Sequence, residues 1–278
     1  MLNSKQFIVI GAVVVLMAVL YSLDIKGLVK PEDTANTGAA ANAGAAITVE
    51  SVSATAKQGL SANFAKQITD LEASLKGASG ADRIALEKEL ARKWDDVNQP
   101  APAAMYMESV AMQENKYENW LKAGDHFTDA YQATQDSVMV PALVHKAIDA
   151  YKKADTLKPN TIEVKTGLGI AYVSGTETPM QGIQLLLDVV KQYPKNIKAN
   201  MNLGLFSMKS GQYAKAVDRF KTVIEAQPGP EAWFYLASSY ESLGNKPEAI
   251  AAYQKAKELA AEPALTRFVD NKIQELRK

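Results

Sequence analysis

The chain has 278 residues, and its 31 basic and 31 acidic side chains leave a formal net charge of zero. This balance provides no basic surface for nucleic acid, and the lack of cysteine excludes disulfides, thiolate metal sites and thiol catalysis. After residue 50, the helix-forming residues Ala, Lys, Glu, Gln and Leu dominate, and no long period-two alternation occurs. We therefore predict an all-α fold.

The first predicted element is an apolar helix from Phe7 to Leu23, which carries no charged residue. Its length is at the short end of what spans a bilayer, and Tyr21 near its end suits the membrane interface. A cleaved signal peptide has a similar apolar core, but the nearest Ala-rich stretch follows only about sixteen residues later. We therefore expect residues 1–23 to form a short tail and an uncleaved single-pass membrane anchor.

Residues 24–48 are predicted to form a flexible linker, because they are rich in Ala, Gly, Asn and Thr and contain little apolar bulk. Positive charges near the anchor do not decide its orientation, since Lys5 opposes Lys26 and Lys30. A very short tail before a large domain usually stays inside. We therefore expect the folded domain to lie outside the cytoplasm.

Residues 49–80 are predicted to form one long amphipathic helix that Gly59 weakens and that Gly77 and Gly80 end. Its apolar residues recur every three or four positions: Val49, Val52, Ala56, Leu60, Phe64, Ile68, Leu71 and Leu75. This helix either packs on the helices that follow or serves in dimerisation or partner binding. Two further helices are expected, one from near Ser79 and one from about Ala101 to Gln113.

Internal repetition is the strongest pattern in the chain. Small residues recur at spacings of 35, 34 and 33, namely Ala147, Gly182, Ala216 and Ala249. Prolines follow three of them, namely Pro159, Pro194 and Pro228. Small residues allow two helices to approach closely, and proline ends the second helix. Each period therefore predicts an antiparallel helix pair, which buries its apolar faces only by stacking on the next pair.

This pattern resembles the tetratricopeptide repeat (TPR), W-x2-L-G-x2-Y…A-x3-F-x2-A…P. The best-matched copy contains Trp233, Leu236, Ala237 and Tyr240, followed by Ala249, Tyr253 and Ala256. In the preceding copy, Ser207 replaces the aromatic residue near the end of the first helix. The resemblance implies a right-handed α-solenoid with an array over residues 81–262 and a capping helix over 263–278. The predicted copies span 84–116, which is degenerate, 117–160, 162–195, 197–229 and 230–262.

No motif indicates catalysis or a cofactor. The chain has no HExxH, GxxxxGK[ST] or GxSxG, and its two histidines, His126 and His145, lie beside residues of the repeat core. The acidic pairs Asp95–Asp96 and Glu87–Glu89 are expected on outward helix faces, where charge is solvated. We therefore predict a protein that is not an enzyme and that holds neither a cofactor nor a metal ion.

The TPR resemblance implies a peptide groove on the inner, concave face of the first helices. Counted along each first helix, the groove comprises Glu118, Leu121, Asp125 and Thr128; Glu163, Thr166, Ile170 and Val173; Lys198, Met201, Leu205 and Met208; and Glu231, Phe234, Ser238 and Glu241. Chaperone-binding TPR proteins hold a C-terminal carboxylate with Lys, Arg and Asn, but this groove offers only Lys198 with Asn202 nearby. An apolar segment without acidic character fits better, and the alternative is that a segment of the same chain fills the groove.

The resemblance implies an adaptor or scaffold that binds other proteins or peptides and is tethered to a membrane through Phe7–Leu23. If the organism is a bacterium, this architecture is similar to that of single-pass inner-membrane TPR proteins that act in envelope assembly, protein translocation or quality control. The alternative is a homo-oligomeric structural membrane protein, built through the 49–76 helix and the array.

Overall fold

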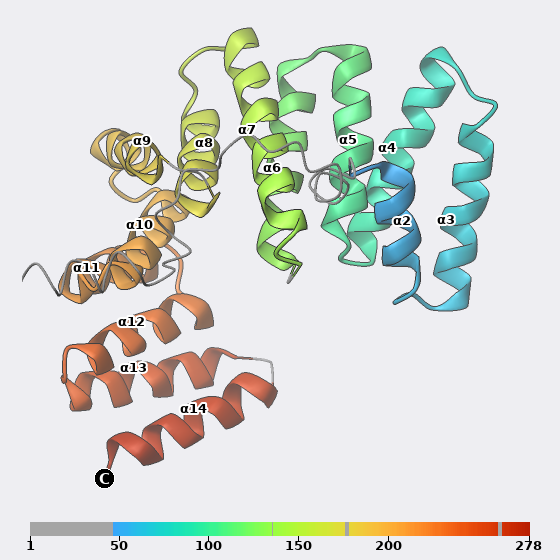
Figure 1. Ribbon diagram of the computed structural model, residues 1–278. Helices are drawn as coiled ribbons and strands as arrows, with labels where there is room; N and C mark the ends of the chain where they lie inside the picture. The colour runs from blue at the N-terminus through green and yellow to red at the C-terminus, as the bar shows by residue number, and fades with distance from the viewer. Residues whose placement is uncertain (1–46, 135, 176–177, 261–262) are drawn as a thin grey trace, which may run out of the picture. The chain divides into compact units, whose positions relative to one another are not determined.

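The computed structural model describes residues 47–134, 136–175, 178–260 and 263–278 (Figure 1). Within these ranges every regular element is an α-helix, and none is long and apolar enough to cross a membrane. The predicted anchor, Phe7–Leu23, and all but the last two residues of the predicted linker lie outside the described residues.

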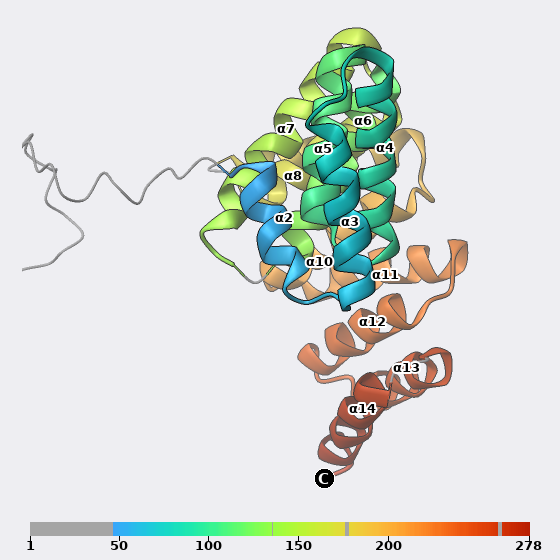
Figure 2. The same ribbon diagram turned by 90° about the vertical axis from the view of Figure 1, so that its right-hand side faces the viewer.

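Thirteen helices follow one another along the described chain. They are α2 (Val49–Lys57), α3 (Ala62–Leu75), α4 (Gly80–Asp96), α5 (Pro100–Glu114), α6 (Tyr117–Ala133), α7 (Met139–Leu157), α8 (Ile162–Gly175), α9 (Pro179–Gln192), α10 (Ile197–Lys209), α11 (Tyr213–Ala226), α12 (Pro230–Ser242), α13 (Lys246–Leu259) and α14 (Pro263–Leu276). Helices that are adjacent in sequence pack as pairs, from α4 with α5 to α12 with α13 (Figures 1 and 2).

The segment predicted as one helix over residues 49–80 is two helices, so that prediction is wrong. The break lies between Lys57 and Ala62, where Gly59 weakens the helix and Ser61 caps the next one by accepting a bond from the Phe64 amide. The division lets α2 pack on α5 while α3 packs on α4. The segment therefore packs on the following helices of its own chain, as one of the two sequence interpretations held.

Glycine residues bring neighbouring helices close together around Tyr151. The ring of Tyr151 on α7 lies against Gly124 on α6 and Gly167 on α8. A Cβ atom at Gly124 would lie 2.6 Å from that ring, so any larger residue there would displace it. Glycine at these positions therefore allows a buried tyrosine to join two successive helix pairs.

The buried core divides into three groups along the chain. The first is continuous from Val52 to Ala171, spanning α2 to α8, and includes the fully buried Trp94 and Phe127. The second lies among α8, α9 and α10, and the third lies among α11 to α14. The described chain is therefore an array in which each helix pair contacts mainly its neighbours.

The copy at residues 117–160 is longer than the other copies, and its extra residues mainly lengthen its two helices. Helix α6 runs to Ala133 and α7 begins at Met139. The side chains of Met139 and Val140 pack partly on the first core group, whereas Val138 is 78% exposed. Most of this segment therefore extends the array, and its apolar tip remains in solvent.

Glu87 was expected on an outward face, and that expectation is wrong. Its side chain is only 1% exposed, because it lies on the same face of α4 as Leu90, Ala91 and Trp94. Arg83, one turn earlier, pairs with its carboxylate at 3.0 Å. Partners on two helices therefore compensate for burying this charge, as the cavity below shows.

Candidate peptide-binding surface

Three first helices of successive pairs enclose a hollow that contains part of the predicted groove. The hollow has a volume of about 410 Å³ and collects Asp125 from α6, Ile170 from α8 and Lys198 from α10. Its other lining residues are Thr128, Asp129, Gln132, Tyr151, Ile162, Glu163, Thr166, Gly167, Asn196, Ile197 and Asn202. A polypeptide segment that enters this hollow would contact three helix pairs at once.

Hydrogen bonds hold the polar wall of the hollow. The Tyr151 hydroxyl donates to Asp125 Oδ1 at 2.8 Å and lies 3.1 Å from Thr128 Oγ1. Burial raises the pKa of the Tyr151 phenol well above its usual value, and the neighbouring Asp125 raises it further. The tyrosine therefore stays protonated and keeps Asp125 in a fixed position.

Acidic groups outnumber basic ones in the hollow. Asp125, Asp129 and Glu163 line it, against Lys198 alone. Partial burial raises the pKa of the Asp129 carboxyl group, while nearby His126 acts in the opposite direction. The site can accept hydrogen bonds and attract a cationic side chain, and its floor is apolar, formed by Ile162, Ile170 and Ile197.

The other predicted groove residues do not line this hollow. Leu121 packs partly against the first core group and Val173 against the second. Met201, Leu205, Met208 and Phe234 pack partly against the third core group. These half-buried side chains support neighbouring helices and also contribute to the surface, so this part of the groove stays a prediction.

The last section of the stripe is in contact with the capping helix of the same chain. Lys272 on α14 pairs with Glu241 at 3.0 Å, and the Tyr253 hydroxyl donates to the same carboxylate at 2.7 Å. The rings of Phe234 and Phe268 lie 5.8 Å apart, centre to centre. At this end, α14 therefore occupies part of the surface that the resemblance assigned to a ligand.

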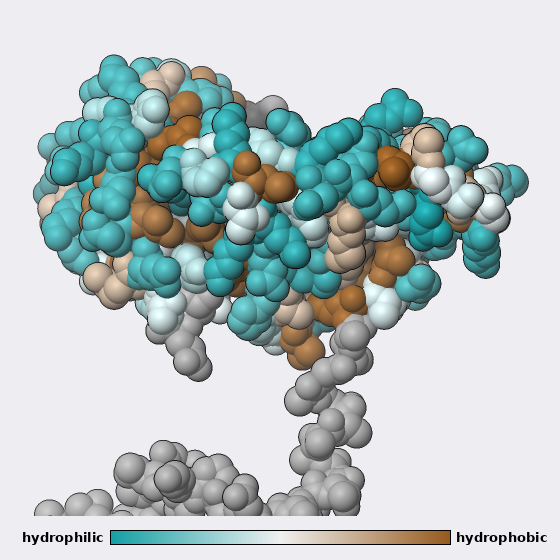
Figure 3. All heavy atoms as spheres, turned by 90° about the horizontal axis from the view of Figure 1, so that it is seen from above, coloured by the Kyte–Doolittle hydropathy of each residue, from teal (hydrophilic) through white to brown (hydrophobic). Residues whose placement is uncertain are grey.

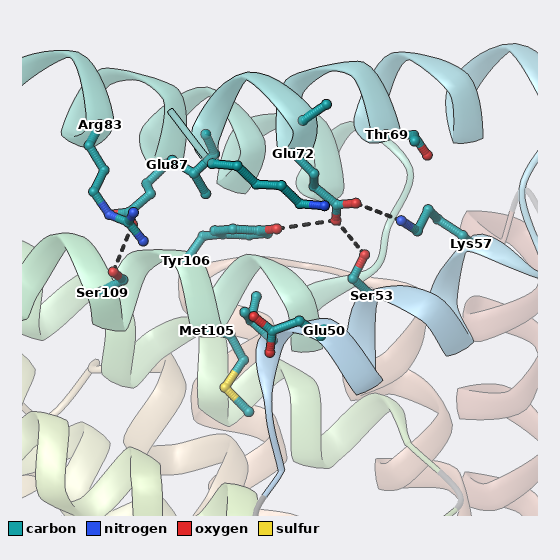
Figure 4. Close-up of a pocket in the computed structure, with 14 residues that line it drawn as sticks. Glu50, Ser53, Lys57, Thr69, Glu72, Arg83, Glu87, Met105, Tyr106 and Ser109 are labelled. Carbon is teal, nitrogen blue, oxygen red and sulfur yellow. Dashed lines mark hydrogen bonds and ion pairs between the residues drawn. The ribbon is translucent and has the colours of Figure 1, made fainter. Parts of the chain in front are cut away.

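A second cavity, which the sequence did not predict, lies among α2, α3, α4 and α5 (Figure 4). It has a volume of about 490 Å³, and three carboxylates line it, of which Glu72 and Glu87 each have several partners. Glu72 accepts bonds from Ser53 at 2.5 Å, Lys57 at 2.6 Å and Tyr106 at 3.1 Å. This carboxylate therefore joins α2, α3 and α5.

Glu87 is the other carboxylate of this cavity with several partners. Besides pairing with Arg83, it accepts a bond from Ser109 on α5 at 2.9 Å (Figure 4). It also accepts a bond from Gln113 on α5 at 2.6 Å. Both carboxylates thus have their partners within the protein, and these bonds join α2 to α5. The signal available in the sequence was the spacing of Glu87 from Leu90 and Trp94, which places all three on one helix face.

The described residues contain no cluster of His, Asp and Glu side chains that could hold a metal ion. On the face drawn in Figure 3, apolar side chains lie in small groups separated by hydrophilic ones. Such a mixed surface suits several limited contacts with a polypeptide better than one large apolar interface.

Comparison with known proteins agrees with this architecture. Residues 207–264 match the family model of the tetratricopeptide repeat. The described chain has the fold of a TPR solenoid. A sequence comparison with curated proteins finds no match.

Several solved TPR structures resemble this TPR solenoid. The structure of TTC0263, a thermophilic TPR protein in Thermus thermophilus, is 19% identical and covers 69% of this chain and 98% of its own, with a TM-score of 0.53. The MamA protein is 22% identical and covers 63% of this chain and 90% of its own, with a TM-score of 0.45. YrrB, a TPR protein with an unusual peptide-binding site, is 18% identical and covers 75% of this chain and 97% of its own, with a TM-score of 0.43. At these identities, the likeness concerns the fold alone.

Proposed function

We propose that this protein is an adaptor that binds segments of other proteins in the hollow shared by α6, α8 and α10. The supporting observation is that Asp125, Ile170 and Lys198, each from a different helix pair, line one hollow. TPR solenoids generally serve as scaffolds for protein–protein interaction. The ligand is a segment with apolar side chains and a basic group, because the floor is apolar and acids outnumber bases on the walls.

Site-directed crosslinking tests this proposal in the full chain. A photoreactive phenylalanine at Glu163, a residue that lines the hollow, should capture a partner in native membranes. The same group at exposed Lys191, outside the hollow, is the control. Asp129→Lys should abolish the crosslink at position 163, because it reverses a wall charge. Identical products from both positions would show that the hollow is not the binding site.

The proposal includes a membrane tether formed by Phe7–Leu23, supported by the uncharged length of that segment. In a bacterium, the repeats would lie outside the cytoplasm at the inner membrane and serve envelope assembly, protein translocation or quality control. The intact protein from membranes should have the mass of the full chain, apart from loss of the first Met. A mature product that begins near the Ala-rich linker would overturn the tether.

A homo-oligomeric structural role was the alternative. Its basis was a free amphipathic helix at residues 49–76, but Val52 and Ile68 are buried against other helices of the same chain. The adaptor is therefore preferred. Measuring the size of the protein with and without residues 49–76 distinguishes the two roles, since only the structural role predicts an oligomer that depends on this segment.

A further inference from the structure

A separate hollow of about 420 Å³ lies among α9, α10 and α11. Its apolar lining comes from Met180, Ile183 and Leu187 on α9, and from Leu203 and Phe206, next to Ser207, on α10. Helix α10 thus serves two hollows with different faces, because Lys198 and Asn202 line the one described above. The α9–α11 hollow is therefore distinct from the proposed peptide site.

This hollow lies where the repeat pattern lacks an aromatic side chain. The position of Ser207 holds Trp94, Phe127, Tyr172 and Tyr240 in the other first helices. In α12, the ring of Tyr240 lies towards the preceding helix, with Lys221 Nζ of α11 at 5.8 Å from its centre. Ser207 instead donates to the carbonyl of Leu203 in its own helix at 2.7 Å. Phe206, one residue earlier, fills only part of the space, since the hollow remains.

Apolar side chains around the hollow remain open to solvent. Met180 is 70% exposed and Leu187 is 37% exposed, whereas Ile183 and Leu203 form a nearly buried floor. An apolar floor with an exposed apolar rim favours an apolar group over water. The missing group has the size and character of the aromatic side chain that the other repeats carry at this position.

Two cationic side chains, Lys215 and Arg219, line the edge of the hollow and have no carboxylate partner among the described residues. Lys215 Nζ donates to the amide oxygen of Gln212 at 2.6 Å, and Arg219 Nη1 donates to that of Asn200 at 3.0 Å. Asp218 is the one acid in the lining, so basic groups exceed acidic ones there. The charge therefore complements a carboxylate on the incoming polypeptide.

From this geometry we infer that the α9–α11 hollow binds an aromatic side chain of a partner protein, next to which the partner carries an acidic residue. The aromatic ring occupies the space left by Ser207, and the carboxylate pairs with Lys215 or Arg219. This contact supplies what the chain's own sequence omits at one junction between helix pairs. It does not depend on the hollow of α6, α8 and α10.

Short labelled peptides test the inference with the full chain in detergent micelles, and empty micelles correct for partitioning. The probes are acetylated peptides containing Asp-Glu-Trp, Asp-Glu-Ala or Lys-Lys-Trp, followed by fluorescence anisotropy. The Asp-Glu-Trp peptide should bind at least about ten-fold more tightly than either of the others. Equal affinity for all three peptides, or no binding of the first at millimolar concentration, overturns the inference.

A substitution that fills the hollow with a side chain of this protein gives the decisive test. Ser207→Tyr should weaken binding of the Asp-Glu-Trp peptide at least about ten-fold and raise the melting temperature, because it restores the missing ring. Ser242→Tyr, at an exposed position at the end of α12 and outside the hollow, should change neither. If Ser207→Tyr binds the Asp-Glu-Trp peptide as tightly as the wild type does, the inference is overturned. If Lys198→Glu also abolishes binding of this peptide, the peptide occupies the hollow of α6, α8 and α10 instead.

A second variant serves if Ser207→Tyr does not fold. Met180→Glu places a negative charge at the open rim and should cost little stability, because this side chain is 70% exposed. Met180→Glu should weaken binding of the Asp-Glu-Trp peptide at least about ten-fold. Arg219→Gln should weaken binding of the same peptide and leave binding of the Lys-Lys-Trp peptide unchanged. If Met180→Glu binds the acidic peptide as the wild type does, the inference is wrong.

Discussion

The helices before α9 and those after it are joined differently. From α2 to α8 the buried core is continuous, and Trp94 and Phe127 are fully buried at the aromatic position of their repeats. From α8 to α11 the core divides into separate groups, and α9 packs on α10 less extensively than α5 on α6, α7 on α8 or α11 on α12. Ser207 occupies the aromatic position at that junction. The comparison indicates that the missing ring accompanies sparser packing between α9 and α10.

Removing a ring from the continuous region should have the largest effect. Phe127→Ala should lower the free energy of unfolding by about 3–5 kcal/mol, because it leaves a cavity in a fully buried site. Phe268→Ala, in the second region and 48% exposed, is the matched control and should cost about 1 kcal/mol. Urea unfolding followed by circular dichroism measures both. Similar losses would contradict the contrast between the regions.

Glu87→Gln tests whether the first region also depends on its buried charge. The variant keeps an amide that can meet Ser109 but loses the ion pair with Arg83, so we expect a loss of about 1–3 kcal/mol. Glu89→Gln on the same helix should stay within about 0.5 kcal/mol of the wild type. A neutral Glu87→Gln would show that the pair with Arg83 contributes little, whatever its burial.

Tyr240→Ser should create in the second region the gap that Ser207 leaves at α9 and α10. We expect a loss of about 1–2 kcal/mol, together with earlier exchange of amide hydrogens in α12 and α13 than in α6. Tyr193→Ser is the control, because Tyr193 is 53% exposed at the end of α9. Uniform amide exchange across the array in Tyr240→Ser would refute a role for the ring in joining neighbouring pairs.

The smallest expected effect concerns pH. Burial lowers the pKa of the His126 imidazole, although Asp95 at 3.4 Å acts in the opposite direction. The pKa of His126 in the folded protein lies below its pKa in the unfolded chain. The contribution of neutral His126 to stability is therefore fully present above about pH 6.5 and is lost as the pH falls towards the folded pKa. His126→Gln should reduce the difference in melting temperature between about pH 7.5 and about pH 5.5.

The matched control for this effect is His145→Gln, since His145 is exposed. It should leave the dependence of the melting temperature on pH unchanged. A His126→Gln variant with the same pH dependence as the wild type would show that other groups control acid stability.

The repeat architecture could be predicted because its signals are local and recur. Small residues such as Ala147 and prolines such as Pro159 mark helix contacts and helix ends wherever they occur. The ligand surface was harder to predict. The periodicity of the first helices places Phe234 and Glu241 in the same stripe as Lys198. The contacts of Phe234 and Glu241 with α14, however, depend on how this last helix packs on the array. The groove beyond the α6–α8–α10 hollow stays a prediction.

The sequence by itself determined the all-α class, the period of the helix pairs and the replacement of an aromatic residue by Ser207, since each follows from spacing along one chain. Only the tertiary structure decided that Glu87 is buried, that residues 49–80 divide into two helices, and that the space beside Ser207 has an open apolar rim. Those features depend on side chains from other helices, such as Ser109 and Met180. Burial and charge pairing arise between elements that are distant in sequence, whereas helical periodicity is already complete within one element.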